Sequence, residues 1–217
     1  MPRFDAVVFD FDGVLVESVD VKTRAFAALY SGYGAGVVAK VVAYHLEHGG
    51  ISRFEKFRHF HREFLGQPLS AAEEAKLGAQ FSELVEDAVV GARWIVGARE
   101  FLETWHSRLP LFVASGTPDE ELKRIVERRG MTRYFARMRG SPATKGEIIS
   151  GFVTGHGLDR NRVLMVGDAG TDLQGALAAG VSFLGISSAP NHAFAATVPV
   201  LPDLARLADF LTTPAPQ

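Results

Sequence analysis

Short apolar runs recur along the chain, and a turn or a polar cluster follows each of them. Three of these runs, at residues 6–9, 111–114 and 163–166, have the length and the uniform hydrophobicity of buried strands, and residues 181–185 predict a further strand. Helical patterns lie between and after them, at about 97–106, 118–130, 145–156, 172–179 and 204–211. Strands that alternate with helices imply right-handed crossover connections. The pattern therefore predicts an α/β fold with a doubly wound, Rossmann-like parallel sheet.

The segment between the first run and residue 92 has a different pattern, which is helical. Phenylalanines at positions 54, 57, 60 and 64 share one face of a helix. Ser70 and Glu73 have the spacing of a capping box at the start of another helix. We therefore predict an α-helical cap at residues 16–91, inserted after strand one, and an α/β core made of residues 1–15 and 92–217. The cap would then be a lid over the crevice where such sheets bind ligands.

Composition and charge exclude several classes of protein. The 217 residues carry a net charge of −2, which argues against a general nucleic-acid binder. The chain contains no cysteine, so disulfides, thiolate metal sites and cysteine nucleophiles are excluded. The pattern predicts neither a signal peptide nor a membrane span, which needs an apolar stretch of roughly 18 residues. We expect a cytoplasmic protein, a monomer or a homodimer, with no nucleic-acid or membrane partner.

Acidic residues cluster at the ends of two of the predicted strands. Asp10 and Asp12 follow the run at 6–9, and Asp168 and Asp172 follow the run at 163–166. The carboxyl ends of parallel strands meet at one crevice, so these carboxylates are expected to converge. Converging carboxylates would repel one another unless a hard cation such as Mg²⁺ lay between them. We therefore predict a metal-dependent site, and its form indicates phosphoryl chemistry.

Four motifs occur in an order that resembles the haloacid dehalogenase (HAD) superfamily. The first is Val-Phe-Asp-Phe-Asp-Gly-Val-Leu at 8–15, and the second is Ala-Ser-Gly-Thr at 114–117. Lys145 resembles the third motif, and Gly-Asp-Ala-Gly-Thr-Asp at 167–172 resembles the fourth. The insertion after strand one is similar to that of the subgroup with a helical cap, which includes phosphoglycolate-phosphatase-like and β-phosphoglucomutase-like enzymes. One such motif would be a weak signal, whereas four in register are specific.

The resemblance implies a role for each acidic residue. Asp10 would be the nucleophile that forms an aspartyl phosphate. Asp12 would be the general acid and base, which protonates the leaving oxygen and then activates water. The Asp10 carboxylate, the backbone carbonyl of Asp12 and Asp168 would hold Mg²⁺, with Asp172 as a further ligand or a support.

The remaining motif residues would stabilise the phosphate. Ser115 and the backbone N–H groups of Gly116 and Thr117 lie at a predicted strand-to-helix turn, where they can cradle phosphate oxygens. Lys145 would neutralise charge on the nucleophile and on the transferring phosphoryl group. These four residues complete the catalytic and phosphate-binding set that the resemblance implies.

Two positions separate the activities within the superfamily. Dehalogenases and phosphonoacetaldehyde hydrolases lack an aspartate at the position of Asp12, so its presence disfavours cleavage of carbon–halogen and carbon–phosphorus bonds. Mutases that resemble β-phosphoglucomutase have a histidine ten residues after that aspartate, where this chain has Lys22. The leading hypothesis is a Mg²⁺-dependent phosphatase that hydrolyses a small phosphorylated metabolite, such as a sugar phosphate or a phosphoglycolate-like acid. A sugar phosphomutase, or a catalytically silent binding protein on the same fold, is the alternative.

The cap is expected to select the substrate. Gly-Gly-Ile-Ser-Arg at 49–53 resembles the specificity loop of these caps, and the Arg53 guanidinium suits a carboxylate or a second phosphate. Lys22, Lys56, Arg58 and Arg62 would add positive charge near the substrate, although a solvated face is the commoner explanation for such a run. His48 is the cap histidine that we expect to meet the substrate. The alternative for Arg53 is a structural role, capping or decorating the surface of a helix. The sequence does not identify the metabolite.

Overall fold

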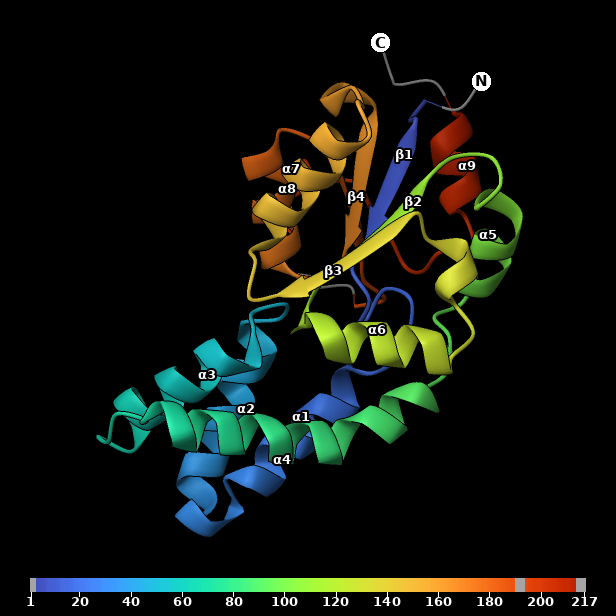
Figure 1. The fold of residues 1–217 in the computed structure, drawn as a ribbon. Coiled ribbons are helices and arrows are strands. Elements are labelled where there is room, and N and C mark those ends of the chain that lie inside the picture. Colours follow the sequence, from blue (N-terminus) through green and yellow to red (C-terminus); the bar gives the residue numbers. More distant parts are fainter. Residues whose placement is uncertain (1–2, 190–193, 214–217) are drawn as a thin grey trace.

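The computed structural model describes residues 3–189 and 194–213. Within these residues, six parallel strands form one sheet in the order β3-β2-β1-β4-β5-β6 (Figure 1). The strands are β1 (Ala6–Phe9), β2 (Leu111–Pro118), β3 (Arg137–Ser141), β4 (Val163–Gly167), β5 (Ser182–Ile186) and β6 (Val200–Leu201). The sheet confirms the predicted doubly wound α/β fold, with β1 paired between β2 and β4.

Helices cover both faces of the sheet, as Figure 1 shows. On one face lie α7 (Lys145–Gly155) and α8 (Gly170–Ala179), and on the other lie α5 (Ala98–Trp105), α6 (Asp119–Arg128) and α9 (Leu207–Thr212). Successive side chains of a strand point to opposite faces. Ala6 and Val8 of β1 therefore pack in the cluster with α7 and α8, whereas Val7 and Phe9 pack in the cluster with α5, α6 and α9. Burial on both faces explains the uniformly apolar runs.

The segment between β1 and α5 is mainly helical and lies beyond the carboxyl ends of the strands (Figure 1). It contains α1 (Val19–Leu29), α2 (Ala35–Glu47), α3 (Arg53–His59), a π-helical turn η2 (Phe60–Phe64) and α4 (Ala71–Val90). Short 3-10 turns lie at Ser31–Tyr33 (η1), Thr132–Tyr134 (η3) and Arg160–Arg162 (η4). The described helices α1 to α4 fall within the predicted cap of residues 16–91, whose boundaries as a domain stay a prediction. No helix in the described part of the chain has both the length and the apolar character needed to cross a membrane.

Local sequence signals explain how the cap helices form and pack. Ser70 and Glu73 make the predicted capping box at the start of α4, because each side chain bonds the backbone N–H of the other residue. The predicted phenylalanine stripe packs as the core of the cap. The ring centroid of Phe26 lies 5.8 Å from that of Phe57 and 5.7 Å from that of Phe60, both in edge-to-face contact.

The hydrophobic pattern does not predict the two edge strands, β3 and β6. The sequence of β3 is Arg-Met-Arg-Gly-Ser, and both of its arginines are exposed. At the opposite edge, β6 is only two residues long. An edge strand pairs with a single neighbour and keeps one side in water, so it lacks the continuous apolar run of a buried strand.

Candidate active site

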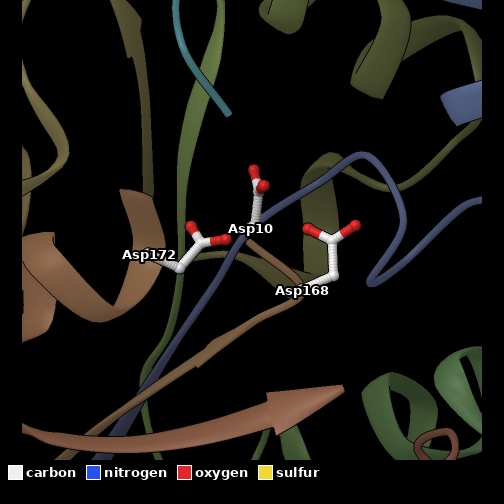
Figure 2. Close-up of side chains that lie close together, drawn as sticks. All are labelled: Asp10, Asp168 and Asp172. Carbon is white, nitrogen blue, oxygen red and sulfur yellow. The ribbon is translucent and has the colours of Figure 1, made fainter. Parts of the chain in front are cut away.

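Strands β1 and β4 are neighbours in the sheet, and their carboxyl ends carry the acidic residues. Asp10 follows β1 directly, and Asp168 follows β4. Asp172 comes from the first turn of α8, and the three carboxylates point toward one another (Figure 2). One carboxylate oxygen of each residue lies within 4.8 Å of the other two. The structure therefore brings together three of the four predicted carboxylates.

Asp10 is buried and hydrogen-bonded at both carboxylate oxygens. Its Oδ1 accepts from the backbone N–H of Phe11 at 2.7 Å, and its Oδ2 accepts from the Lys145 ammonium at 2.8 Å. Burial raises the pKa of Asp10 to about 7; Lys145 opposes this shift, and the carboxylates of Asp172 and Asp12 add to it. Asp10 therefore lies in a region of negative charge that Lys145 neutralises only in part.

Lys145 is a fixed cation at the start of α7. Thr144 and Glu147 hold this helix start with a capping box. The Lys145 ammonium donates to Asp10 and to Asp172. Burial alone would lower the pKa of Lys145, but these two carboxylates outweigh it and raise the pKa. A permanent positive charge beside Asp10 is what the predicted role of Lys145 requires.

Asp168 is the third residue of the carboxylate cluster, and it lies where the chain after β4 approaches Gly13 very closely. Gly13 has a φ of +79°, and a Cβ on it would lie 2.1 Å from Asp168 Oδ2. Only glycine accommodates both the backbone conformation and the contact. Burial raises the pKa of Asp168 well above its usual range, and the carboxylates of Asp10 and Asp172 add to the effect. Oxygen donors with excess negative charge fit a hard divalent cation, so these three residues could hold a metal ion such as Mg²⁺.

The side chain of Asp12 has a separate set of partners. Its Oδ1 accepts from the Ser18 hydroxyl at 2.5 Å, and its Oδ2 accepts from the Thr117 hydroxyl at 3.0 Å. Lys22 forms an ion pair with Asp12 and also donates to the Thr117 hydroxyl at 2.8 Å. Burial alone would raise the pKa of Asp12, but Lys22 and the hydrogen bonds hold it below its usual range. Asp12 is thus a charged carboxylate beside the carboxylate cluster, and both its acid–base role and the metal contact of its backbone carbonyl stay predictions.

The predicted phosphate cradle lies in an irregular part of β2. Ser115 and Thr117 are buried, and the Ser115 hydroxyl accepts from the backbone N–H of Thr117 at 3.1 Å. The pairing of β2 with β3 shifts register between Ala114 and Pro118, so the strand bends here. Gly116 lies at this bend, between Ser115 and Thr117, and lines a cavity together with Asp10 and Asp168.

The chain matches the family model of haloacid dehalogenase-like hydrolases over residues 4–180. It belongs to this family. The phosphoglycolate phosphatase of Aliivibrio fischeri is 25% identical over 203 residues, which cover 86% of this chain and 85% of that protein. A crystal structure of a predicted phosphoglycolate phosphatase from Haemophilus somnus has a TM-score of 0.73 at 18% identity, covering 97% of this chain and 99% of that one. A conserved HAD-like protein of unknown function from Agrobacterium tumefaciens has a TM-score of 0.72 at 22% identity, covering 95% and 97%.

The cap of this HAD-like hydrolase is closed over the site. A Cβ on Gly116 would lie 2.4 Å from the carbonyl oxygen of Gly50, so the cap loop and the predicted phosphate cradle are in direct contact. The Thr171 hydroxyl donates to the carbonyl of Gly49 at 2.8 Å. A Cβ on Gly50 would lie 2.1 Å from Thr171 Oγ1 and 3.0 Å from Lys145 Nζ. The paired glycines of the loop therefore permit a backbone approach that a side chain would prevent.

Arg53 has a protein partner where the sequence predicts a substrate anion. Its guanidinium forms a buried bidentate ion pair with Glu121 of α6 and donates to the Ser82 hydroxyl at 2.9 Å. The ring centroid of Phe81 lies 4.4 Å from the guanidinium carbon. Arg53 also lines the cavity beside Asp10, so its contact with the substrate stays a prediction. The ion pair between Arg53 and Glu121 therefore links cap helix α3 to core helix α6.

His48 lies in an aromatic stack of the cap. Its ring stacks on Tyr44 with the centroids 3.8 Å apart, and its Nδ1 lies 3.0 Å from the Tyr44 carbonyl oxygen. The opposite face of Tyr44 stacks on His59 at 3.9 Å. Its neighbours Glu47 and Gly49 line the cavity but His48 does not, and its contact with the substrate stays a prediction.

A cavity of about 180 Å³ lies between the core carboxylates and the cap. Its lining includes the predicted Asp10, Asp12, Asp168, Lys22, Arg53, Gly116 and Thr117, and also His45 and Lys56. The sequence predicts no specific contact for His45 or for Lys56, which it places only among the basic residues of the cap. A signal for Lys56 exists, because it lies four residues before Phe60 and so falls on the apolar face of its helix. A lysine on such a face is either buried or extended to the surface, and here it is buried.

Proposed function

We propose that this hydrolase is a Mg²⁺-dependent phosphatase that acts on a small phosphorylated metabolite through an aspartyl phosphate. The observation that carries the proposal is the buried Asp10 carboxylate, which contacts the Lys145 ammonium and borders the same cavity as Asp12. A carboxylate nucleophile, a separate acid–base carboxylate and a fixed cation are the groups that phosphoryl transfer needs. The name of the Aliivibrio fischeri relative agrees with this class of reaction.

The proposed reaction has two steps. In the first, a carboxylate oxygen of Asp10 attacks the phosphorus atom, and the bond from phosphorus to the ester oxygen breaks. Asp12, when protonated, gives its proton to that oxygen, and the alcohol leaves. In the second step, water attacks the phosphorus atom while Asp12 takes the proton of the water. The acyl phosphate bond then breaks, which restores the Asp10 carboxylate and releases inorganic phosphate.

The surrounding residues would hold the charges in place during both steps. Lys145 would keep Asp10 ionised and stabilise the phosphoryl oxygens. Lys22 holds Asp12 in the carboxylate form, which is the base needed in the second step. Mg²⁺, held by Asp10, Asp168 and Asp172 with the carbonyl of Asp12, would supply positive charge to the phosphoryl oxygens.

The size of the cavity favours a small substrate. Its volume of about 180 Å³ is below the range of about 300–1,000 Å³ that is typical of ligand sites. The closed cap loop also covers part of the site, and exclusion of water there would strengthen the electrostatic contacts inside it. A sugar phosphate or a short phosphorylated acid fits these conditions better than a nucleotide or a phosphoprotein.

A phosphate-release screen over a panel of phosphorylated metabolites with Mg²⁺ tests the proposal. We expect release from small aliphatic esters by the wild-type protein and none by Asp10→Asn. The absence of release from every ester, including p-nitrophenyl phosphate, in a protein with native circular dichroism would refute the proposal. An isomerised sugar phosphate without free phosphate would favour the mutase alternative.

A further inference from the structure

Lys56 is a buried lysine in the cap wall of the cavity, and the proposed mechanism gives it no role. Lys56 is 2% exposed, and it lines the same cavity as Asp10 and Asp12. Its ammonium lies 2.8 Å from His45 Nδ1 and 3.3 Å from the His45 carbonyl oxygen. An ammonium has only donors, so Nδ1 accepts and the ring is neutral, with its proton on Nε2. Neither contact neutralises the charge of Lys56.

The other cations around the cavity are already neutralised by carboxylates of the chain. Lys22 pairs with Asp12, Arg53 pairs with Glu121, and Lys145 pairs with both Asp10 and Asp172. Among the residues that the structure describes, no carboxylate forms an ion pair with Lys56. Glu47 lines the same cavity, but it is exposed. Lys56 is therefore a cation of the cavity wall with no counter-charge from the protein.

A buried cation without a counter-charge destabilises the folded protein. Burial lowers the pKa of Lys56 to about 7, and repulsion from Lys22 adds to this shift while Asp12 opposes it. Lysines and carboxyls with such perturbed environments in a cavity are concentrated at functional sites. An anionic ligand in the cavity would supply the missing charge and stabilise the ammonium form.

We propose that Lys56, positioned by His45, binds a carboxylate at the far end of the substrate, which makes the substrate a short phosphate monoester that ends in a carboxylate. The proposal rests on the proposed phosphatase function and deepens it. One unneutralised cation matches the single charge of a carboxylate. A second phosphate would bring a charge of about −1.5 to −2 and leave part of it unpaired in the cavity. The phosphate end would lie at Asp10, and the volume of about 180 Å³ limits the chain between the two ends.

The test compares two esters of the same length on the full-length enzyme with Mg²⁺. One is 2-phosphoglycolate, which ends in a carboxylate, and the other is ethylene glycol monophosphate, which ends in a hydroxyl. We expect the wild-type enzyme to prefer the carboxylate ester in kcat/KM, and Lys56→Met to lose about 10- to 100-fold on that ester, the range for one charged hydrogen bond. The hydroxyl ester should change by less than about threefold. Lys76→Met removes an exposed lysine of the same cap and should behave as wild type.

A stability measurement separates a substrate contact from a structural one. Because Lys56 is an unneutralised buried charge, Lys56→Met should melt at the wild-type temperature or above it. A lower melting temperature together with equal losses on both esters would show that Lys56 only supports the cap, and would overturn the proposal. If Lys56→Met does not fold, Lys56→Gln keeps a polar group of similar length, and the same comparison of the two esters applies to it.

Two further arms separate the other outcomes. A wild-type preference for ethylene glycol bisphosphate over 2-phosphoglycolate, lost in Lys56→Met, would assign the residue to a phosphate and refute the carboxylate. The Asp10→Asn variant with Mg²⁺ measures binding of 2-phosphoglycolate by calorimetry without turnover. If the wild-type enzyme releases no phosphate from any ester, the phosphatase proposal fails. Binding to Asp10→Asn that Lys56→Met weakens at least about tenfold would still support the subsite, and binding that it leaves unchanged would refute it.

Discussion

Replacement of Arg53 by methionine should destabilise the protein through Glu121, whatever the substrate. Glu121 is 3% exposed, and its carboxylate accepts from both terminal nitrogens of Arg53. Without the guanidinium, the Ser82 hydroxyl is the one hydrogen-bond donor to Glu121 that remains among the described residues. The buried negative charge of Glu121 is then left unneutralised. Removal of one partner from a buried ion pair costs about 3–5 kcal/mol of the free energy of unfolding. For a chain of this length that loss corresponds to about 6–20 °C in the melting temperature.

A double-mutant cycle separates the loss of the ion pair between Arg53 and Glu121 from other effects of each substitution. Urea unfolding followed by circular dichroism would compare wild type, Arg53→Met, Glu121→Leu and the double variant. The double variant should recover most of the loss, because replacing both partners of a buried pair by apolar groups is often neutral. Arg58→Met is a matched control on the same helix, because Arg58 is exposed in its ion pair with Glu74. This substitution should lower the free energy of unfolding by less than about 1 kcal/mol.

The kinetics of the same variants distinguish the two roles of Arg53. If its guanidinium mainly holds the cap on the core, Arg53→Met should lower kcat/KM for an anionic substrate and for p-nitrophenyl phosphate by similar factors. A free energy of unfolding of Arg53→Met no lower than that of Arg58→Met would refute the structural role of Arg53. A loss confined to the anionic substrate would then restore the direct substrate contact that the sequence predicts.

Three further predictions concern the site and the lid. Asp10→Asn should abolish phosphate release with an unchanged circular dichroism spectrum, because an amide cannot form the acyl phosphate; turnover in a preparation free of wild type would remove Asp10 from the nucleophile role. Activity should require Mg²⁺ and be poor with Ca²⁺, which prefers more ligands and longer bonds; full activity in excess EDTA, after verified removal of metal, would contradict this. Gly50→Ala should lower kcat/KM by about tenfold or more, because its Cβ would lie 2.1 Å from Thr171 Oγ1 and hold the cap open. Gly66→Ala has a similar positive φ and nothing within 4 Å, so it should keep full activity, and equal losses in both would point to backbone strain.

Much of the fold follows from short-range patterns in the sequence. The strands β1, β2 and β4 are buried on both faces, so each leaves a continuous apolar run that can be recognised without its neighbours. The capping box at Ser70 depends only on residues three apart. The meeting of Asp10 with Asp168 is also predictable, because parallel topology places the ends of adjacent strands together.

The partners of the charged side chains depend on the tertiary structure alone. Arg53 pairs with Glu121 across 68 positions of sequence, and Lys22 pairs with Asp12 while bonding Thr117, 95 positions away. These contacts follow from how the closed cap packs on the core, and periodicity carries no information on that packing. Whether Lys56 extends to water or is buried beside His45 is decided in the same way. The sequence thus determines which charges are near the site, whereas the cap–core packing decides which of them remain unneutralised and available to a substrate.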